Sequence, residues 1–442
     1  MRIVLLTPGT GHFYCGSCLR DSTLGRGLRA RGHDVLLSPL YLPFVLEDGP
    51  EESTPGESAR NNGADTAVHL GGINLYLQQK LPFLRHLPRF LAERLDRPGL
   101  LRWASRKGNL TDASGLGAMT LSMLRGEEGR QVGEVEKLVG WLQSIERPDV
   151  VCLSNVMLVG LARRLREALG VPVVCTLQGE APFLDSLPEP YRGRCWSTLA
   201  ERARDVEAFI PVSRHYGELM AGRLGLSAER VHVVHNGIDL DGESPAEPRA
   251  AGAPPSIGYL ARMCADKGLP TLVEAFLLLK ERDRVPGLRL EVAGVLLDAD
   301  RPLVDGLRGR LQAAGLIGEA EFHPNLERAD KLAFLRGLSV LSVPALYGES
   351  FGLYLLEAMA AGVPVVQPRH GAFPELLEAT GGGILCEPDD PASLADGLES
   401  LLTDELRARE LGERGRRAVL ERFTAERMAR GVEEVCTMVC AR

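Results

Sequence analysis

Short apolar runs alternate with helix-like segments along most of the chain. The first forty residues set the pattern, with an apolar run at 2–6, a glycine-containing turn, a helix-like segment at 18–31 with leucines on one face, and a second apolar run at 35–37. The alternation resumes over 150–234 and again over 256–366. Apolar strands separated by helices predict parallel sheets with helices on both faces. The chain is therefore expected to belong to the α/β class.

Two interruptions divide this alternation. Residues 48–66 are acidic and rich in Gly, Ser and Asn, and they open an irregular helical insertion that we expect over about 48–130. Residues 241–255 carry four prolines and no periodic apolar pattern, so they are the predicted linker. This places one Rossmann-like domain at 1–240 and a second at 256–420, facing each other across a cleft.

Several elements are expected from the pattern at particular places. We predict strands at 231–234 and 338–343, a helix at 353–361, and one final helix over about 404–440. The pattern leaves open whether the last segment, 421–442, packs back on the first domain.

Size and charge narrow the classes of function. A chain of 442 residues is too long for one compact core, in agreement with two domains. The formal net charge of −8 argues against a nucleic-acid binder, because phosphate backbones select basic surfaces. An anionic ligand must therefore be held by a local site.

We expect neither export nor membrane insertion of this chain. The apolar run at 2–6 is too short for a signal peptide, and no stretch has the apolar length needed to cross a bilayer. Its nine cysteines are scattered, with several inside apolar runs, as is typical of reduced thiols. We expect a cytoplasmic protein.

The segment 346–353 lies between a predicted strand and a predicted helix. Its glycines allow close approach of the backbone to a ligand, and the amides at the helix start suit a diphosphate. Glu349 in the loop and Glu357 in the helix can both face one cleft, where carboxylates accept from sugar hydroxyls. Taken alone, this segment is equally well explained as an ordinary helix N-terminus with two acidic residues and no ligand.

A second segment at 259–268 favours the ligand site. Arg262 and Lys267 follow the first strand of the second domain, at the carboxyl edge of the same sheet. Two cations there can neutralise a diphosphate and the charge of a leaving group.

These motifs together resemble those of the family 4 glycosyltransferases with the GT-B fold. The resemblance rests on Arg262, Lys267, the spacing from Glu349 to Glu357, and the Ala-Met-Ala-Ala-Gly-Val-Pro-Val-Val run that follows. Gly16 with its helix, His235-Asn236-Gly237-Ile238-Asp239 and Ala372-Phe373-Pro374-Glu375 are similar to further motifs of the family, in the right order.

The resemblance implies a retaining transferase that moves a hexose from a UDP- or GDP-sugar to an acceptor hydroxyl without a bound metal or other cofactor. It implies that Arg262 and Lys267 bind the donor diphosphate, that Glu357 binds the ribose, and that Glu349 binds the transferred sugar. The remaining donor-binding positions that it implies are Gly16, Ser350, Phe351, Gly352 and Leu353.

The acceptor side departs from the family pattern. Gln178 stands where relatives commonly have a histidine near the reaction centre, and Gln cannot share a proton as imidazole does. Either Gln178 only positions substrate, or Glu180 takes a polar role in the cleft. Gly72 and Asn74 lie in a segment that resembles glycogen- and starch-synthase relatives and are further acceptor-side candidates.

Two other features of the sequence each allow more than one role. Cys15 and Cys18 form a C-x-x-C that is suited to redox or zinc chemistry, or to ordinary packing. Residues 80–107 carry eight basic residues against two acidic ones, interleaved with apolar residues, which suits either peripheral membrane contact or a core-facing helix.

The sequence leaves three readings of function. The first is the hexosyltransferase, whose acceptor is a carbohydrate, a lipid-linked sugar or a small molecule. The second is a glucan- or sucrose-synthase-like transferase on the same fold, and the third is a catalytically silent nucleotide-sugar-binding protein. The presence of both glutamates and both cations favours an active enzyme.

Overall fold

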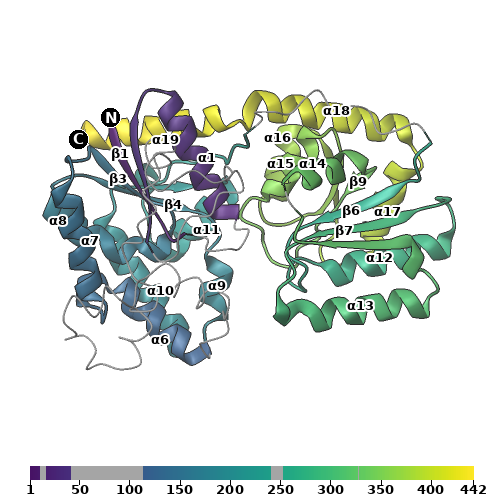
Figure 1. Ribbon diagram of the computed structural model, residues 1–442, viewed down its shortest axis with the longest axis horizontal. Coiled ribbons are helices and arrows are strands. Elements are labelled where there is room, and N and C mark those ends of the chain that lie inside the picture. The colour runs from purple at the N-terminus through teal and green to yellow at the C-terminus, as the bar shows by residue number, and fades with distance from the viewer. Residues whose placement is uncertain (10–15, 41–112, 240–251, 327) are drawn as a thin grey trace, which may run out of the picture. The chain divides into compact units, whose positions relative to one another are not determined.

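The computed structural model describes residues 1–9, 16–40, 113–239, 252–326 and 328–442. It divides into two compact units, one made of Met1–His235 with Ala425–Arg442 and the other of Asn236–Thr424. Each unit contains one parallel sheet flanked by helices (Figure 1). The predicted α/β class, with a Rossmann-like sheet in each half, is therefore confirmed.

The first unit is built on a five-stranded parallel sheet in the order β2-β1-β3-β4-β5. Its strands are β1 (Arg2–Thr7), β2 (Asp34–Pro39), β3 (Val150–Leu153), β4 (Val173–Leu177) and β5 (Ala208–Pro211). Its helices are α1 (Gly16–Ala30), α6 (Ala113–Leu124), α7 (Val132–Ser144), α8 (Ala162–Leu169), α9 (Ala181–Ser186), α10 (Tyr191–Arg202), α11 (Arg214–Leu224) and α19 (Ala425–Cys440).

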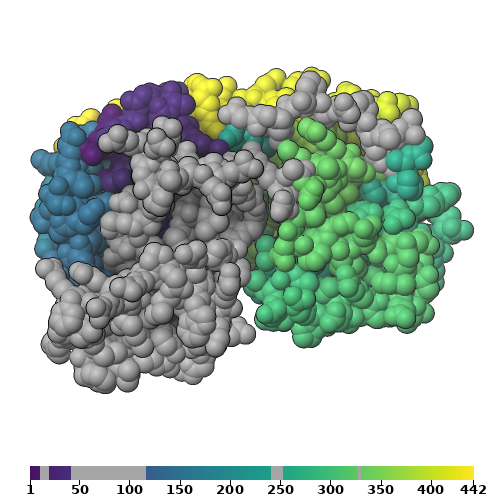
Figure 2. Space-filling view, in the orientation of Figure 1, coloured from purple at the N-terminus to yellow at the C-terminus, as the bar shows by residue number. Residues whose placement is uncertain are grey.

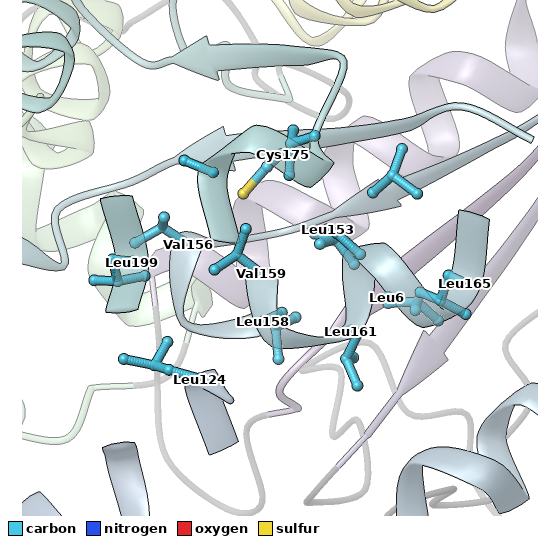
Figure 3. Close-up of a cluster of buried hydrophobic side chains, with 14 of the residues drawn as sticks. Leu6, Leu124, Leu153, Val156, Leu158, Val159, Leu161, Leu165, Cys175 and Leu199 are labelled. Carbon is cyan, nitrogen blue, oxygen red and sulfur yellow. The ribbon is translucent and has the colours of Figure 1, made fainter. Parts of the chain in front are cut away.

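Uninterrupted apolar strands give this sheet two buried faces, as parallel sheets require. On one face Leu153, Val159, Cys175 and Leu199 belong to a buried apolar cluster in which strands, a helix and a short helical turn meet (Figure 3). On the other face α19 packs against α1, and a Cβ added at Gly27 would lie 2.9 Å from the Cβ of Ala429. The C-terminal helix is thus part of the first unit (Figure 1).

The second unit is built on a six-stranded parallel sheet in the order β11-β10-β9-β6-β7-β8. Its strands are β6 (Ser256–Leu260), β7 (Arg289–Gly294), β8 (Ala320–Pro324), β9 (Val340–Leu341), β10 (Val365–Pro368) and β11 (Gly383–Cys386). Its helices are α12 (Leu269–Arg282), α13 (Arg301–Ala313), α14 (Arg328–Gly337), α15 (Leu353–Ala360), α16 (Phe373–Thr380), α17 (Pro391–Leu402) and α18 (Glu405–Arg422).

Helices α12 and α13 lie on one face of this sheet, and α14, α15 and α16 lie on the other (Figure 1). In the space-filling view the green residues of this unit form one closely packed body (Figure 2). The chain returns to the middle of the sheet after β8, because β9 pairs with β6. That return decides which loops become neighbours.

Two strand predictions need correction. Residues 231–234 form only an isolated bridge, Val231 with Phe209, instead of a strand. The amide of Val234 reaches the carbonyl of Pro211, but proline has no N–H to return the bond, so pairing along this edge of β5 stops. The strand predicted at 338–343 is limited to Val340–Leu341.

The single final helix predicted over 404–440 is also wrong. Phe423 and Thr424 separate α18 from α19, since the carbonyl of Phe423 accepts from the amide of Ile238 at 2.9 Å and Thr424 bridges to the same residue. Phe423 is itself buried. The break is also the boundary between the units, so α18 belongs to the second unit and α19 to the first.

Candidate active site

The functional motifs of the second unit meet where its strand order reverses. From β6 the chain continues outward to β7 and β8, and then comes back to β9 on the other side of β6. Loops leaving β6 and β9 at their carboxyl ends therefore diverge to opposite faces, and ligands of open α/β sheets bind in the resulting crevice. The loop after β6 carries Arg262 and Lys267, and the loop after β9 carries Glu349.

Lys267 and Glu349 form an ion pair at this point, through Nζ and Oε2. The hydroxyl of Tyr354 donates to the same oxygen at 3.1 Å, and that of Tyr347 lies at 3.5 Å. The ammonium also lies over both rings, 5.0 Å from the centroid of Tyr347 and 5.7 Å from that of Tyr354. Burial alone would lower the pKa of Lys267, but the charge of Glu349 outweighs it and raises that pKa above its usual value.

Backbone contacts fix the loop after β9 against the loop after β6. The amide of Leu346 donates to the carbonyl of Asp266 at 2.9 Å. Gly268 has φ +73°, and a Cβ there would lie 1.8 Å from the carbonyl oxygen of Pro344. Only glycine allows this approach, so the position of Lys267 relative to the Glu349 loop is set by main chain.

The loop after β10 holds Glu349 from the other side. The amide of Ala372 donates to the carbonyl of Glu349 at 2.9 Å. Gly371 has φ +62°, and a Cβ there would lie 2.5 Å from the amide nitrogen of Glu349. Glu349 is therefore contacted by the loops that follow β6 and β10, the two strands on either side of β9. Its side chain is only 10% exposed.

Arg262 lies at the same edge of the sheet and is held by Asp300. Its Nε and Nη2 reach the two carboxylate oxygens at 2.7 and 3.1 Å. Asp300 follows β7 and is buried at the start of α13. This bidentate pair fixes the guanidinium plane and, by its hydrogen bonds, raises the pKa of Arg262. Since 48% of the Arg262 side chain is exposed, it can still meet an anion.

Glu357 is paired with Lys331 of α14. The distance from Nζ to Oε1 is 2.9 Å, and the two side chains are 13% and 15% exposed. The pair anchors one carboxylate oxygen of Glu357. Lys331 is a residue that the sequence analysis did not identify.

The residues expected to bind the diphosphate lie at the start of α15. Gly352 precedes the helix with φ +93°, and Leu353 is its first residue. Ser350 and Phe351 are buried, and the ring of Phe351 packs near Phe423 at 6.4 Å between centroids. Ser350 and Phe351 therefore directly precede the start of α15, where the sequence predicted them.

In the first unit, Gln178 follows β4 and its amide is turned inward. Nε2 donates to the Oδ1 of Asp21 at 3.2 Å and to the carbonyl of Ser154 at 2.5 Å. Asp21 also accepts from Thr7, the last residue of β1, so the network joins the carboxyl ends of β1, β3 and β4. Burial raises the pKa of Asp21 above its usual value.

Glu180 accepts hydrogen bonds from its own unit. Its carboxylate takes the amides of Val156 at 3.1 Å, Gln178 at 3.0 Å and Gly179 at 2.9 Å, and the hydroxyl of Tyr216 at 2.9 Å. These bonds close the turn that carries Gln178. A direct role for Glu180 toward an acceptor stays a prediction.

The remaining predicted positions lie at the start of α1 or outside the described residues. Gly16 is the first residue of α1. Gly72, Asn74, Cys15, the side chain of Cys18 and residues 80–107 lie outside the described residues. Their roles stay predictions.

One group of side chains in the described residues has ligand atoms close enough for a metal ion. The atoms of Glu291, Glu321 and His323 lie within 4.8 Å of one another on β7 and β8. Arg289 already pairs with both glutamates, at 3.5 and 3.9 Å. None of the donor-motif residues belongs to this group.

Among the helices that the structure describes, none has the length and apolar character to cross a membrane.

The structure brings Lys267, Glu349 and the start of α15 together in the second unit. Arg262 lies at the same edge of the sheet, in the loop after β6, and Glu357 lies in α15. The residues that hold them were missed on sequence. Asp300 and Lys331 lie 38 and 26 residues from their partners, and no local signal connects them. Tyr347 and Tyr354 lie inside the recognised segment, but only the fold shows that both hydroxyls point to Glu349.

Comparison with known proteins gives two consecutive family matches. Residues 117–241 match "Glycosyltransferase Family 4", and residues 242–418 match "Glycosyl transferases group 1". Every candidate donor residue of the second unit lies inside the second match.

Curated relatives include two with the same description. A D-inositol 3-phosphate glycosyltransferase of Xylanimonas cellulosilytica is 28% identical over 348 residues, which cover 74% of this chain and 77% of the relative. One from Mycobacterium bovis is 32% identical over 179 residues, 40% of this chain and 37% of the relative.

Solved structures with the same fold cover nearly the whole chain. HepE of Anabaena in complex with UDP and glucose has a TM-score of 0.69 at 17% identity and covers 99% of both chains. A sucrose-phosphate synthase of Thermosynechococcus elongatus has a TM-score of 0.68 at 18% identity, covering 100% of this chain and 99% of that one. At these identities the likeness establishes the fold alone.

Proposed function

Because the chain belongs to the group 1 glycosyltransferases, we propose that it moves a hexose from a UDP- or GDP-sugar to an acceptor hydroxyl with retention of configuration. The main observation behind the proposal is the ion pair between Lys267 and Glu349, which lies where the strand order of the sheet reverses. A nucleotide-sugar presents a diphosphate and a polyhydroxylated ring, and this site offers a cation and a carboxylate side by side.

Each donor-side residue has a distinct role in the proposal. Lys267 and Arg262 neutralise the diphosphate and the charge that develops on the leaving phosphate. Glu357, anchored by Lys331 through one oxygen, accepts from the ribose hydroxyls with the other. The amides at the start of α15 bind the phosphate oxygens, as helix N-termini do.

Retention follows in this proposal from same-face substitution. The leaving phosphate oxygen takes the proton of the acceptor hydroxyl while that hydroxyl attacks the anomeric carbon from the same side. Gln178, whose amide hydrogens are directed to Asp21 and Ser154, serves to position substrate and does not exchange protons. The acceptor itself is left open, and D-inositol 3-phosphate, which names the curated relatives, is one compound to assay.

Binding of a nucleotide-sugar tests the proposal directly. We expect UDP, UDP-glucose, GDP or GDP-mannose to raise the melting temperature of the protein, because a ligand of the native state stabilises it by mass action. The stabilising nucleotide-sugar should be slowly hydrolysed without acceptor. If none of the four shifted the melting temperature, or if a transfer product had inverted configuration, the proposal would be wrong.

We also infer that the transfer needs no metal ion, since Lys267 and Arg262 supply the positive charge that a metal would provide. Hydrolysis and transfer are expected to run at the same rate, within about twofold, in EDTA and in Mg²⁺. The measurement is release of free nucleotide under each condition. A loss of activity in EDTA that Mg²⁺ restores would contradict this.

A further inference from the structure

The geometry points to a positioning role for Tyr354. With Lys267 it occupies one carboxylate oxygen of Glu349, Oε2, and so directs the other, Oε1, to a hydroxyl of the transferred sugar. This inference rests on the proposed function of Glu349 and adds which atom meets the sugar and what holds that atom in place.

Three donors converge on the same oxygen. Lys267 Nζ pairs with Oε2, the Tyr354 hydroxyl donates to it at 3.1 Å, and the Tyr347 hydroxyl lies at 3.5 Å. Within the described part of the chain, no hydrogen bond reaches Oε1, and it is not among the polar atoms sealed from solvent. A carboxylate has acceptor capacity on both oxygens, so Oε1 is the atom with capacity to spare.

Lys267 alone would not fix the carboxylate. An ammonium is a compact charge on a flexible stem with three rotatable donors, and it tolerates several orientations of its partner. A phenol has a rigid ring and few rotatable bonds, so its hydroxyl defines a direction. Tyr354 lies in the first turn of α15, next to the amides proposed to bind phosphate, so the helix places the hydroxyl and those amides together.

The direction of the hydrogen bond is also settled by charge. Burial and the negative charge of Glu349 raise the pKa of Tyr354 well above its usual value. The hydroxyl therefore keeps its proton at neutral pH and donates it to the carboxylate. Burial and the same charge raise the pKa of Tyr347 to about 12, so it also stays neutral.

Removal of the one hydroxyl, in Tyr354→Phe, tests the role. We expect the affinity for UDP, which has no sugar, to stay within about twofold of wild type, while the affinity for UDP-glucose falls about fivefold and kcat for its hydrolysis about tenfold, as loss of a hydrogen bond to a charged group predicts. Tyr347→Phe, with the longer distance, should have the smaller effect of about twofold. Calorimetry with UDP and with UDP-glucose measures the affinities.

Two further variants separate positioning from general destabilisation. Thr380→Val removes another buried hydroxyl of the same unit, which donates to the carbonyl of Leu376 at 2.8 Å, and should leave both affinities unchanged. In a Glu349→Gln background, Tyr354→Phe should add little, because residues that act through one another are not additive.

The outcomes distinguish this inference from the function on which it rests. Equal losses for UDP and UDP-glucose in Tyr354→Phe, or no loss for either, would overturn the positioning role. So would a wild-type protein that binds UDP-glucose no more tightly than UDP. If the wild type prefers guanine nucleotides, GDP and GDP-mannose serve as the pair, and a wild type that binds none of the four overturns the proposed function instead.

Discussion

Replacement of Lys267 by methionine is expected to lower kcat/KM for the nucleotide-sugar by about 10²- to 10³-fold, the loss typical of one preorganised charge-stabilising donor. Methionine keeps much of the length and apolar volume of the side chain but removes its charge. The proposed diphosphate site then loses the cation nearest to Glu349. Within the described residues, the Glu349 carboxylate keeps the contacts of the Tyr347 and Tyr354 hydroxyls. Hydrolysis of the donor without acceptor, scaled to the folded fraction from circular dichroism, measures the effect.

Lys280 supplies the matched control. It is also a lysine of the second unit, it pairs with Glu319, and it lies over the ring of Phe276 at 5.7 Å. It lies at the end of α12 that is remote from the carboxyl edge of β6. Lys280→Met is therefore expected to keep kcat/KM within about twofold, because a substitution remote from the site does not couple to it. If Lys267→Met kept a third or more of the wild-type activity, its assignment to the donor diphosphate would fall.

The second large effect is expected at Gly371, which has no side chain of its own. An alanine there meets two penalties, the left-handed conformation at φ +62° and a Cβ placed 2.5 Å from the amide nitrogen of Glu349. Together they should reduce the free energy of unfolding by about 2–5 kcal/mol, since overpacking against main chain adds to the conformational cost. Urea unfolding measures the loss.

An alanine at Gly362 serves as the control that measures the cost of the left-handed conformation alone, without the steric clash. It has a similar conformation, φ +79°, but an added Cβ would meet nothing within 4 Å. Gly362→Ala is therefore expected to cost only about 1 kcal/mol and to leave donor hydrolysis intact. Gly371→Ala should also lower hydrolysis by about 100-fold, because it moves the Glu349 main chain. Equal behaviour of the two variants would show that Gly371 does not support the site.

The family motifs in the sequence already contained most residues of the proposed donor site. Arg262, Lys267, Glu349 and Glu357 were recognisable because each lies at a strand end or a helix start, where local pattern and spacing are informative. The elements on which they lie were also predictable, since buried parallel strands read as continuous apolar runs. The helix predicted at 353–361 is α15 within one residue.

The predictions that failed depended on backbone hydrogen bonds with residues that are distant in sequence. Residues 231–234 have the composition of a strand, but Pro211 on the neighbouring strand has no N–H with which to continue the ladder. The segment 404–440 has the composition of one helix, but Phe423 is buried and its carbonyl pairs with Ile238. In each case a residue far away in sequence decided the outcome.

The sequence by itself determined the class of fold, the alternation of strands and helices, and the residue types available to a diphosphate-sugar. Only the tertiary structure decided that the loops after β6, β9 and β10 are neighbours, because strand order is set by how helices cover a sheet and not by local pattern. From that order follow the pairing of Lys267 with Glu349, the close approach of Gly371 to its main chain, and the two tyrosine hydroxyls on one carboxylate oxygen. Interactions that span tens of residues leave no periodic trace along a chain, so the partners of the site appear only when the sheet is assembled.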